Sequence, residues 1–252
     1  MPLFIETVTV TDFQTNCYIV AARPPRRLPL PPGEGRGEGR LAAPNGTAEP
    51  CLLIDPGGEA DLISARLRHL GLRPELIANT HGHADHIGAN GELRRRFPGV
   101  TIAVGSADAR LLISPVRNLA VFFARWTKSP KPDRLLAEGD LVEAAGVALR
   151  VRELPGHTRG HIVLIAERES PPAVFCGDTL FAGSIGRTDL PGGSHEQLLA
   201  GIARVLLALP PDTVLYPGHG PVTTVAAERA RNPFLRDLRG DTVPSLERSD
   251  PS

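Results

Sequence analysis

The sequence predicts a layered α/β protein with mixed β-sheets. Three observations predict this class: apolar segments of strand length recur along the chain, segments with helical spacing separate several of them, and in places one strand follows another as a hairpin. A strictly alternating, doubly wound sheet would not contain such hairpins. The 252 residues are enough to bury a large core, since a domain of this size removes about 70–75% of its unfolded surface from water.

The first half of the chain shows both periodicities. Residues 4–10 alternate apolar and polar side chains, which is typical of a half-buried strand. Residues 60–70 have helical spacing, and Gly71 is a common helix terminator. The other elements expected here are strands at 17–22, 51–55, 76–80 and 100–104, and a helix that runs through Leu93 to Phe97 and is closed by Pro98-Gly99.

The second half begins with residues 106–138, whose pattern predicts one or two helices and a loop without further detail. A later helix has a clear start, because Ser194 is followed three positions on by Gln197, as in a capping box. The other elements expected here are strands at 149–154, 161–166, 173–176 and 213–216, and a last helix at 222–231.

Residues 23–50 differ in composition from the rest of the chain. They are rich in proline and glycine and offer few side chains that could pack, so we expect a disordered loop insertion between two strands of a hairpin. A long loop is tolerated because its closure entropy grows slowly with length. A basic arm for nucleic acid is the alternative, but glutamates are interspersed with the arginines. We predict a single domain over residues 1–240 and a disordered tail at 241–252.

The charge balance argues against a protein whose main task is to hold nucleic acid. Lysine plus arginine number 28, as do aspartate plus glutamate, so the formal net charge is zero. No apolar run approaches the roughly 18 residues of a membrane span, and no secretory signal pattern is readable at the N-terminus. The 3 cysteines are widely spaced and form no Cys-x-x-Cys pair. We therefore expect a cytoplasmic protein that binds neither nucleic acid nor a membrane.

The segment Thr80-His81-Gly82-His83-Ala84-Asp85-His86 places four side chains that can bind a metal close together. In a helix, residues two apart point about 200° away from each other, so His81 and His83 could share a metal only outside a helix. The strand predicted at 76–80 leads into them and supplies that setting. Because crowding such groups without a cation would be costly, the cluster indicates a metal centre.

Three further candidate ligands each follow a predicted strand: His157, Asp178 and His219. A glycine precedes each of them, which allows the backbone to turn sharply beside a crowded centre. Functional groups in layered α/β proteins gather at the carboxyl ends of strands, so we expect these residues to join the histidine cluster. Imidazole combined with carboxylate suits Zn²⁺ best, with Fe or Mn as alternatives.

Taken in order, these motifs resemble the metallo-β-lactamase fold superfamily, and within it the short glyoxalase II-like hydrolases related to hydroxyacylglutathione hydrolase. The resemblance covers nearly the whole chain outside 23–50. It implies an αβ/βα four-layer sandwich with two mixed β-sheets and the metals at one edge. It rests on Asn16-Cys-Tyr-Ile-Val, Ile54-Asp-Pro-Gly-Gly, Thr80-His-Gly-His-Ala-Asp-His-Ile-Gly-Ala, Pro155-Gly-His-Thr, Gly177-Asp-Thr-Leu-Phe, Gly183-Ser-Ile-Gly-Arg-Thr-Asp, Pro217-Gly-His-Gly and Glu228-Arg-Ala-Arg-Asn-Pro-Phe-Leu.

The resemblance also implies two divalent metal ions and a role for each ligand. His81, His83 and His157 would hold one ion, Asp85, His86 and His219 the other, and Asp178 would bridge both. Two cations about 3.5–4 Å apart can share a hydroxide at neutral pH, because the pKa of bound water falls towards about 7.

That hydroxide would attack the carbonyl carbon of a thioester or a related small acyl compound, of which S-lactoylglutathione is the type. Asp85 and Asp178 are the residues expected to serve catalysis, and no protein nucleophile is needed, so the cysteines are expected to be structural. The resemblance leaves a homo-oligomer open.

Several positions depart from the family pattern, so the resemblance does not decide the identity of the substrate. Full-length glyoxalase II has a helical C-terminal domain that holds glutathione, whereas residues 220–252 alone follow His219, and Gly220 stands where the family usually has glutamate. Arg159 stands where relatives often have proline, and it is either a contact for an anionic substrate or a solvated loop charge.

Two other charged or titratable sites have alternative interpretations. Arg187 and Asp189 are expected to form an ion pair that fixes their loop, with a substrate contact as the alternative. His161 is expected to begin a strand and to hydrogen-bond locally, with a supporting role behind the ligands as the alternative.

Other branches of the superfamily supply competing functions. An iron-dependent glutathione persulfide dioxygenase would use a single iron on His81, His157 and Asp178, but that branch typically has Pro-Ala-His-Asp where this chain has Pro-Gly-His-Gly. A nuclease is disfavoured by the zero net charge. A flavin-linked diiron oxidoreductase is disfavoured by His83, since those relatives have His-x-Glu-x-Asp in the cluster.

Overall fold

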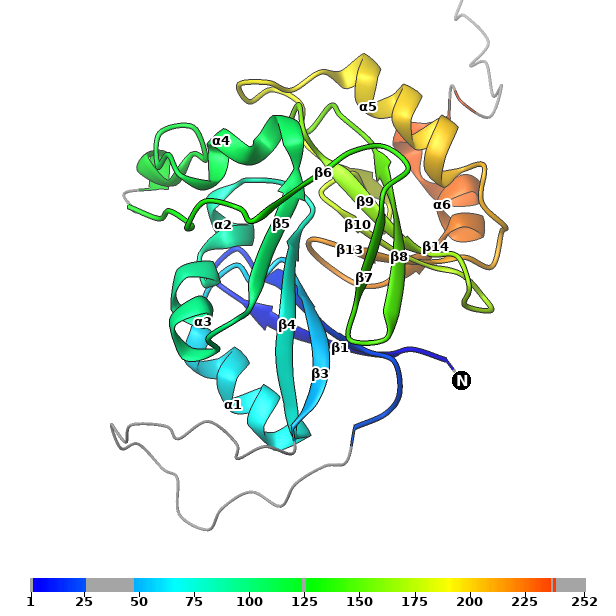
Figure 1. Ribbon diagram of the computed structural model, residues 1–252. Helices are drawn as coiled ribbons and strands as arrows, with labels where there is room; N and C mark the ends of the chain where they lie inside the picture. Colours follow the sequence, from blue (N-terminus) through cyan, green and yellow to red (C-terminus); the bar gives the residue numbers. More distant parts are fainter. Residues whose placement is uncertain (1, 26–47, 124–125, 237, 239–252) are drawn as a thin grey trace, which may run out of the picture.

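The computed structural model describes residues 2–25, 48–123, 126–236 and 238. Two six-stranded sheets pack face to face, and helices cover the outer face of each (Figure 1). The predicted insertion at 23–50 lies mostly outside the described residues, as does the predicted tail at 241–252. The prediction placed the end of the insertion too late, because Glu49 and Pro50 already belong to a strand that pairs with its neighbour.

The first sheet carries the N-terminal half of the chain. Its first three strands pair antiparallel and the remaining ones pair parallel, so the sheet is mixed. The first two strands form a hairpin, as the alternating pattern predicts. In spatial order the strands are β1 (Phe4–Val10), β2 (Thr15–Ala21), β3 (Glu49–Ile54), β4 (Leu72–Asn79), β5 (Thr101–Gly105) and β6 (Arg134–Leu136).

The second sheet carries the C-terminal half and is also mixed, since β10 pairs parallel with β13 and the other pairs are antiparallel. A small hairpin, β11 (Leu180–Phe181) with β12 (Ser184–Ile185), stands apart from it. In spatial order the strands are β14 (Thr223–Thr224), β13 (Val214–Pro217), β10 (Ala173–Gly177), β9 (Ile162–Ala166), β8 (Val147–Glu153) and β7 (Leu141–Ala144).

Two of these strands correct the sequence prediction. Strand β7 was not expected. The last helix, α6 (Val225–Arg231), begins later than the predicted 222, because Thr223 and Thr224 pair with β13. The hydroxyl of Thr224 then accepts a hydrogen bond from the main chain of Ala227, which fixes the helix start.

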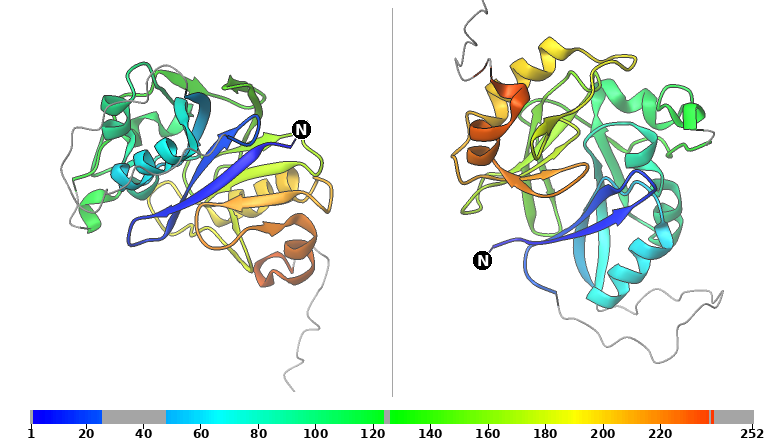
Figure 2. Two further views of the ribbon diagram at one scale, coloured as in Figure 1. Left: turned by 90° about the horizontal axis from the view of Figure 1, so that it is seen from below. Right: turned by 180° about the vertical axis from the view of Figure 1, so that it is seen from behind.

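Three apolar clusters account for the layers. One joins the first sheet to α1 (Ala60–Leu70) and α3 (Asn90–Arg96), one lies between the two sheets, and one joins the second sheet to α5 (His195–Gly201) and α6. Helices this short are marginal in water on their own, so packing of their apolar faces stabilises them. The order helix, sheet, sheet, helix, visible from opposite sides in Figures 1 and 2, confirms the αβ/βα sandwich.

The connection at 106–138 contains short helical turns and one unexpected strand, β6. The turns are η1 (Ser106–Asp108), α4 (Ala109–Leu112) and η2 (Ala120–Phe123). Strands β8, β10 and β13 run in one direction, so the segments that follow them emerge at the same edge of the sandwich. Among the described residues, no helix is both long enough and apolar enough to cross a membrane.

Candidate metal centre

The histidine cluster lies in the turn that leaves β4. His81 and His83 are outside any helix, as their spacing requires, while Asp85 and His86 belong to the one-turn helix α2 (Ala84–Ile87). The rings of His81 and His83 meet edge to face, with centroids 4.8 Å apart. The turn therefore directs both side chains to one place.

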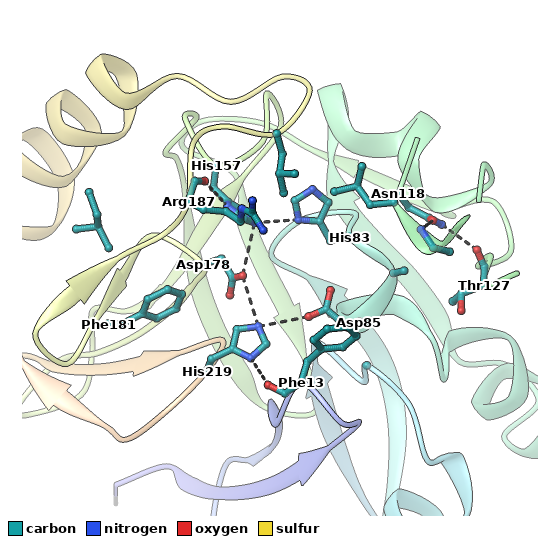
Figure 3. A pocket seen from close by; sticks show the side chains of 16 residues that line it. Phe13, His83, Asp85, Asn118, Thr127, His157, Asp178, Phe181, Arg187 and His219 are labelled. Atoms are coloured by element: carbon teal, nitrogen blue, oxygen red, sulfur yellow. Dashed lines mark hydrogen bonds and ion pairs between the residues drawn. The ribbon is translucent and has the colours of Figure 1, made fainter. Parts of the chain in front are cut away.

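The structure brings all seven predicted ligands together, from both sheets. The ligand atoms of His81, His83 and His157 lie within 4.8 Å of one another, and so do those of Asp85, His86 and His219. Asp178 lies between the two groups. Its Oδ1 is 3.4 Å from Nε2 of His86. Its Oδ2 is 3.5 Å from Nε2 of both His157 and His219 (Figure 3).

Main-chain oxygens orient two of the imidazoles. Nδ1 of His157 donates to the carbonyl oxygen of Arg187 at 2.8 Å, and Nδ1 of His219 donates to that of Phe13 at 2.9 Å. Each bond fixes the orientation of the ring and turns Nε2 towards the centre. No sequence pattern points to Phe13, because its contribution is a backbone atom.

A buried carboxylate, Asp55, orients two further imidazoles. It accepts hydrogen bonds from the Thr80 hydroxyl at 2.6 Å and from Nδ1 of His86 at 3.1 Å. The Thr80 hydroxyl in turn accepts from Nδ1 of His81 at 3.1 Å. Asp55 belongs to the motif Ile54-Asp-Pro-Gly-Gly, but its role could not be predicted from that motif, since its contacts depend on how β3 lies beside β4.

Two buried polar atoms of the centre test whether a metal fits. Among the described residues, Nε2 of His81 and Oδ1 of Asp178 have no hydrogen-bond partner. Buried polar groups without a partner are rare and costly, and a cation at this place would engage both. A donor set of imidazole and carboxylate fits Zn²⁺, with Fe and Mn as alternatives, so the residues present fit the metals that the sequence predicts.

Burial keeps two imidazoles of the first group, those of His81 and His83, neutral. It lowers the pKa of His81 well below its ordinary value, helped by the neighbouring His86. Burial, together with the facing His157, lowers the pKa of His83 to about 3. Neutral imidazoles offer the lone pairs that a cation needs.

In the second group, attraction between opposite charges outweighs burial in setting the pKa values. Burial alone would raise the pKa of Asp85, but His86 and His219 outweigh it and lower that pKa to about 2. Burial likewise opposes ionisation of Asp178, yet His86 and His219 hold its pKa well below the usual range. Burial would lower the pKa of His219, but Asp178 and Asp85 raise it to about 10. Both carboxylates are therefore ionised at neutral pH.

The first hairpin holds the loop of His219 in place. The main chain of Asn16 donates to the Gly218 oxygen at 2.8 Å, and its side-chain amide donates to the Gly220 oxygen at 2.8 Å. A Cβ atom at Gly218 would lie 2.1 Å from Oδ1 of Asp178, so only glycine fits there. Gly220 has φ +73°, a conformation that glycine adopts without strain and glutamate does not.

His161 supports the centre rather than bonding locally. Its buried ring stacks on that of His81, with centroids 5.0 Å apart and an interplanar angle of 20°. Its Nε2 accepts a hydrogen bond from the main chain of Asp178 at 3.1 Å. The expectation of a local hydrogen bond was wrong, because β9 and β10 are neighbours in the sheet and bring these residues together.

A pocket of 460 Å³ opens over the centre. The predicted ion pair is present at its edge: Arg187 forms two bonds of 2.8 Å with Asp189. Arg159 is exposed and does not line this pocket, which favours the solvated loop charge over a substrate contact. Besides five of the predicted ligands, the lining comprises Phe13, Gly57, Ala84, Asn118, Leu119, Ala120, Thr127, Phe181, Ile185, Arg187 and Leu190.

Comparison with known proteins agrees with this geometry. The profile of the metallo-beta-lactamase superfamily matches residues 46–219. Hydroxyacylglutathione hydrolase GloC of Haemophilus influenzae is 36% identical over 233 residues, which cover 92% of this chain and 97% of that protein.

Two solved structures are also similar. The TTHA1623 protein in a di-iron-bound form has a TM-score of 0.73 and 35% identity, covering 91% of this chain and 100% of that one. The BLEG-1 B3 metallo-beta-lactamase has a TM-score of 0.77 and 30% identity, covering 92% of this chain and 99% of that one.

Proposed function

The chain belongs to the metallo-beta-lactamase superfamily, and we propose that it is a dinuclear metal-dependent hydrolase that cleaves thioesters or related small acyl compounds. The observation that carries the proposal is the convergence of two groups of ligand atoms, with Asp178 between them, at the base of a pocket. The similarity to proteins named hydroxyacylglutathione hydrolase supports the choice of a thioester.

Each residue has a defined part in this proposal. His81, His83 and His157 would hold one divalent cation and Asp85, His86 and His219 the other, and Asp178 would serve both. When bound, the cations supply an activated water and polarise the substrate carbonyl. Asp85 and Asp178 line the pocket and are ionised, so they are placed to hold the proton that the attacking water loses.

A protein nucleophile is not required. All three cysteines are buried, and burial raises the pKa of Cys17, Cys51 and Cys176. A buried thiol of raised pKa is a poor nucleophile. This supports a structural role for the cysteines and attack by water.

The second group of ligands bears on the choice between this proposal and the persulfide dioxygenase alternative. A single iron would need only His81, His157 and Asp178. The ligand atoms of Asp85, His86 and His219 also converge, which favours a site for two metals.

The remaining expectations belong to the same proposal. We regard residues 1–240 as one domain, since each metal would be held by residues that follow strands of both sheets. Zn²⁺ is the preferred metal, the substrate is a small molecule in the cytoplasm, and a homo-oligomer remains open.

The proposal is tested by turnover of S-lactoylglutathione and of simple acyl thioesters by purified protein of known metal content. We expect hydrolysis by the wild type, its loss in Asp178→Asn, and its retention in the control His195→Ala, whose exposed side chain starts α5. A protein that carries two metals and hydrolyses no thioester would overturn the substrate assignment. Oxygen consumption with glutathione persulfide would indicate the dioxygenase instead.

A further inference from the structure

One wall of the pocket has an unusual backbone. Residues Asn118, Leu119 and Ala120, called here the Leu119 wall, line the pocket beside Ala84 and Asp85. Leu119 has φ +70°, in the left-handed region that bulky residues avoid because Cβ crowds the following carbonyl group. Such strain persists only where the surroundings impose it, and it concentrates at functional sites.

Asn118 imposes this conformation. Its buried side-chain amide donates to the Thr127 oxygen at 2.9 Å, and its Oδ1 accepts from the main chain of Ala120 at 3.0 Å, so the amide spans the strained residue (Figure 3). Its carbonyl oxygen accepts from the main chain of Ala84 at 3.0 Å, between His83 and Asp85. The wall is therefore fastened both to its own loop and to the metal-binding turn.

Leu119 contributes to the pocket rather than to the core. Only 6% of the residue is exposed, yet it is not a member of the three apolar clusters that the described residues form. A leucine held in this way presents a fixed apolar surface next to the predicted ligands. A small change of its size would change the space available to a substrate.

The rest of the lining is also poor in free polar groups. The amide of Asn118 is engaged with main-chain atoms, and the guanidinium of Arg187 is already paired with Asp189. Phe181, Ile185 and Leu190 supply further apolar lining. The pocket has a volume of 460 Å³, part of which the metals and the water would fill.

From these observations we infer that the Leu119 wall sets the size limit for the acyl group, and that the site selects thioesters of short, unbranched alkanoic acids. This inference rests on the proposed hydrolase function. In this inference the wall contacts the acyl group of the substrate, and the thiol carrier lies towards the open side of the pocket.

The test is a series of acetyl, butyryl, hexanoyl and octanoyl thioesters of one uncharged thiol, N-acetylcysteamine. For the wild type we expect kcat/KM to fall about tenfold or more between butyryl and octanoyl, the discrimination that an apolar pocket wall achieves. Leu119→Gly and Leu119→Ala should remove most of that fall in kcat/KM between butyryl and octanoyl. Leu119→Phe should make the fall in kcat/KM between butyryl and octanoyl larger.

Two variants serve as controls. Leu62→Ala removes an exposed leucine of α1 outside the pocket. Ala145→Gly changes another residue in the left-handed conformation, φ +55°, again outside the lining. Neither should alter the ratio of butyryl to octanoyl turnover.

Binding of the product carboxylates gives a readout that does not depend on turnover. By calorimetry on the metal-loaded protein, octanoate should bind about tenfold more tightly to Leu119→Gly than to the wild type, with acetate unchanged. Absence of thioester hydrolysis would overturn the proposed function and leave this binding comparison standing. Equal chain-length ratios for wild type and Leu119→Gly, in turnover or in binding, would overturn the inference.

Discussion

The carboxylate of Asp108 lies 3.0 Å from the main-chain nitrogen of Gly82 and accepts its hydrogen bond. The same buried carboxylate accepts from the Thr158 hydroxyl at 2.7 Å and from the main chain of Gly160 at 2.8 Å. It therefore joins the turn of His81 and His83 to the loop of His157. None of these three hydrogen bonds involves an imidazole ring.

Substitution of Asp108 by asparagine should weaken the first metal site. In asparagine an NH₂ group, which donates hydrogen bonds, replaces one carboxylate oxygen that accepts them. Two donors would then face each other, which costs about 1–3 kcal/mol of stability. Because the loops would no longer be held together, metal affinity should fall about 10- to 100-fold. Chemical denaturation and competition with a chelator measure the two effects.

The control for this substitution is Asp140→Asn, at a turn where the carboxylate accepts from the main chain of Ala137 far from the centre. It should leave metal affinity unchanged. Wild-type metal affinity in Asp108→Asn would contradict the coupling of the two loops.

Metal binding should release protons at pH 7.5. In the metal-free protein Asp178 and Asp85 raise the pKa of His219 to about 10, so its imidazole carries a proton at this pH that a cation must displace. Since the raised pKa favours the protonated form, affinity should increase as pH rises from 6 towards 9. Calorimetric titration in buffers of different ionisation enthalpy reports the protons directly, and heats that do not depend on the buffer would exclude this competition.

The cysteines should be inert in the folded protein. Cys17, Cys51 and Cys176 are buried, and burial raises the pKa of each thiol. We expect no reaction with a thiol-specific disulfide reagent at pH 8 until denaturant is added, when all three react. Rapid labelling of native protein together with loss of activity would contradict attack by water alone.

The strain at Leu119 should appear in stability as well as in selectivity. Alanine and glycine both remove the leucine side chain, but only glycine adopts φ +70° freely. Leu119→Gly should therefore be more stable than Leu119→Ala by about 1 kcal/mol. Thermal or chemical unfolding of the pair measures the difference, and the reverse order would show that the conformation carries no strain.

Local patterns predict the layered α/β class and the seven candidate ligands, whereas the αβ/βα sandwich was implied by the family resemblance. Strands and helices follow the apolar periodicity, and the ligands stand at strand ends in compact motifs such as Pro217-Gly-His-Gly. Strands β6, β7 and β14 were not expected because they are short, and pairing with a neighbour rather than their own pattern defines them.

Among the residues that hold the ligands in place, Asp55, Asp108 and Phe13 were not predicted, and His161 was given this role only as the alternative, for a related reason. Asp55, Asp108 and His161 act through hydrogen bonds to residues well separated in sequence, and Phe13 acts through a main-chain oxygen. A single sequence contains no signal for such contacts. The ligand roles themselves stay predictions that metal analysis must test.

The most direct test of the metal centre is elemental analysis of the protein purified without added metal, alongside His81→Ala, His219→Ala and Asp178→Asn. The account predicts two divalent cations per chain in the wild type, loss of one in each histidine variant, and a deficit of both in Asp178→Asn. A wild-type protein with no bound cation, or with one that is unaffected by His81→Ala and Asp178→Asn, would contradict it.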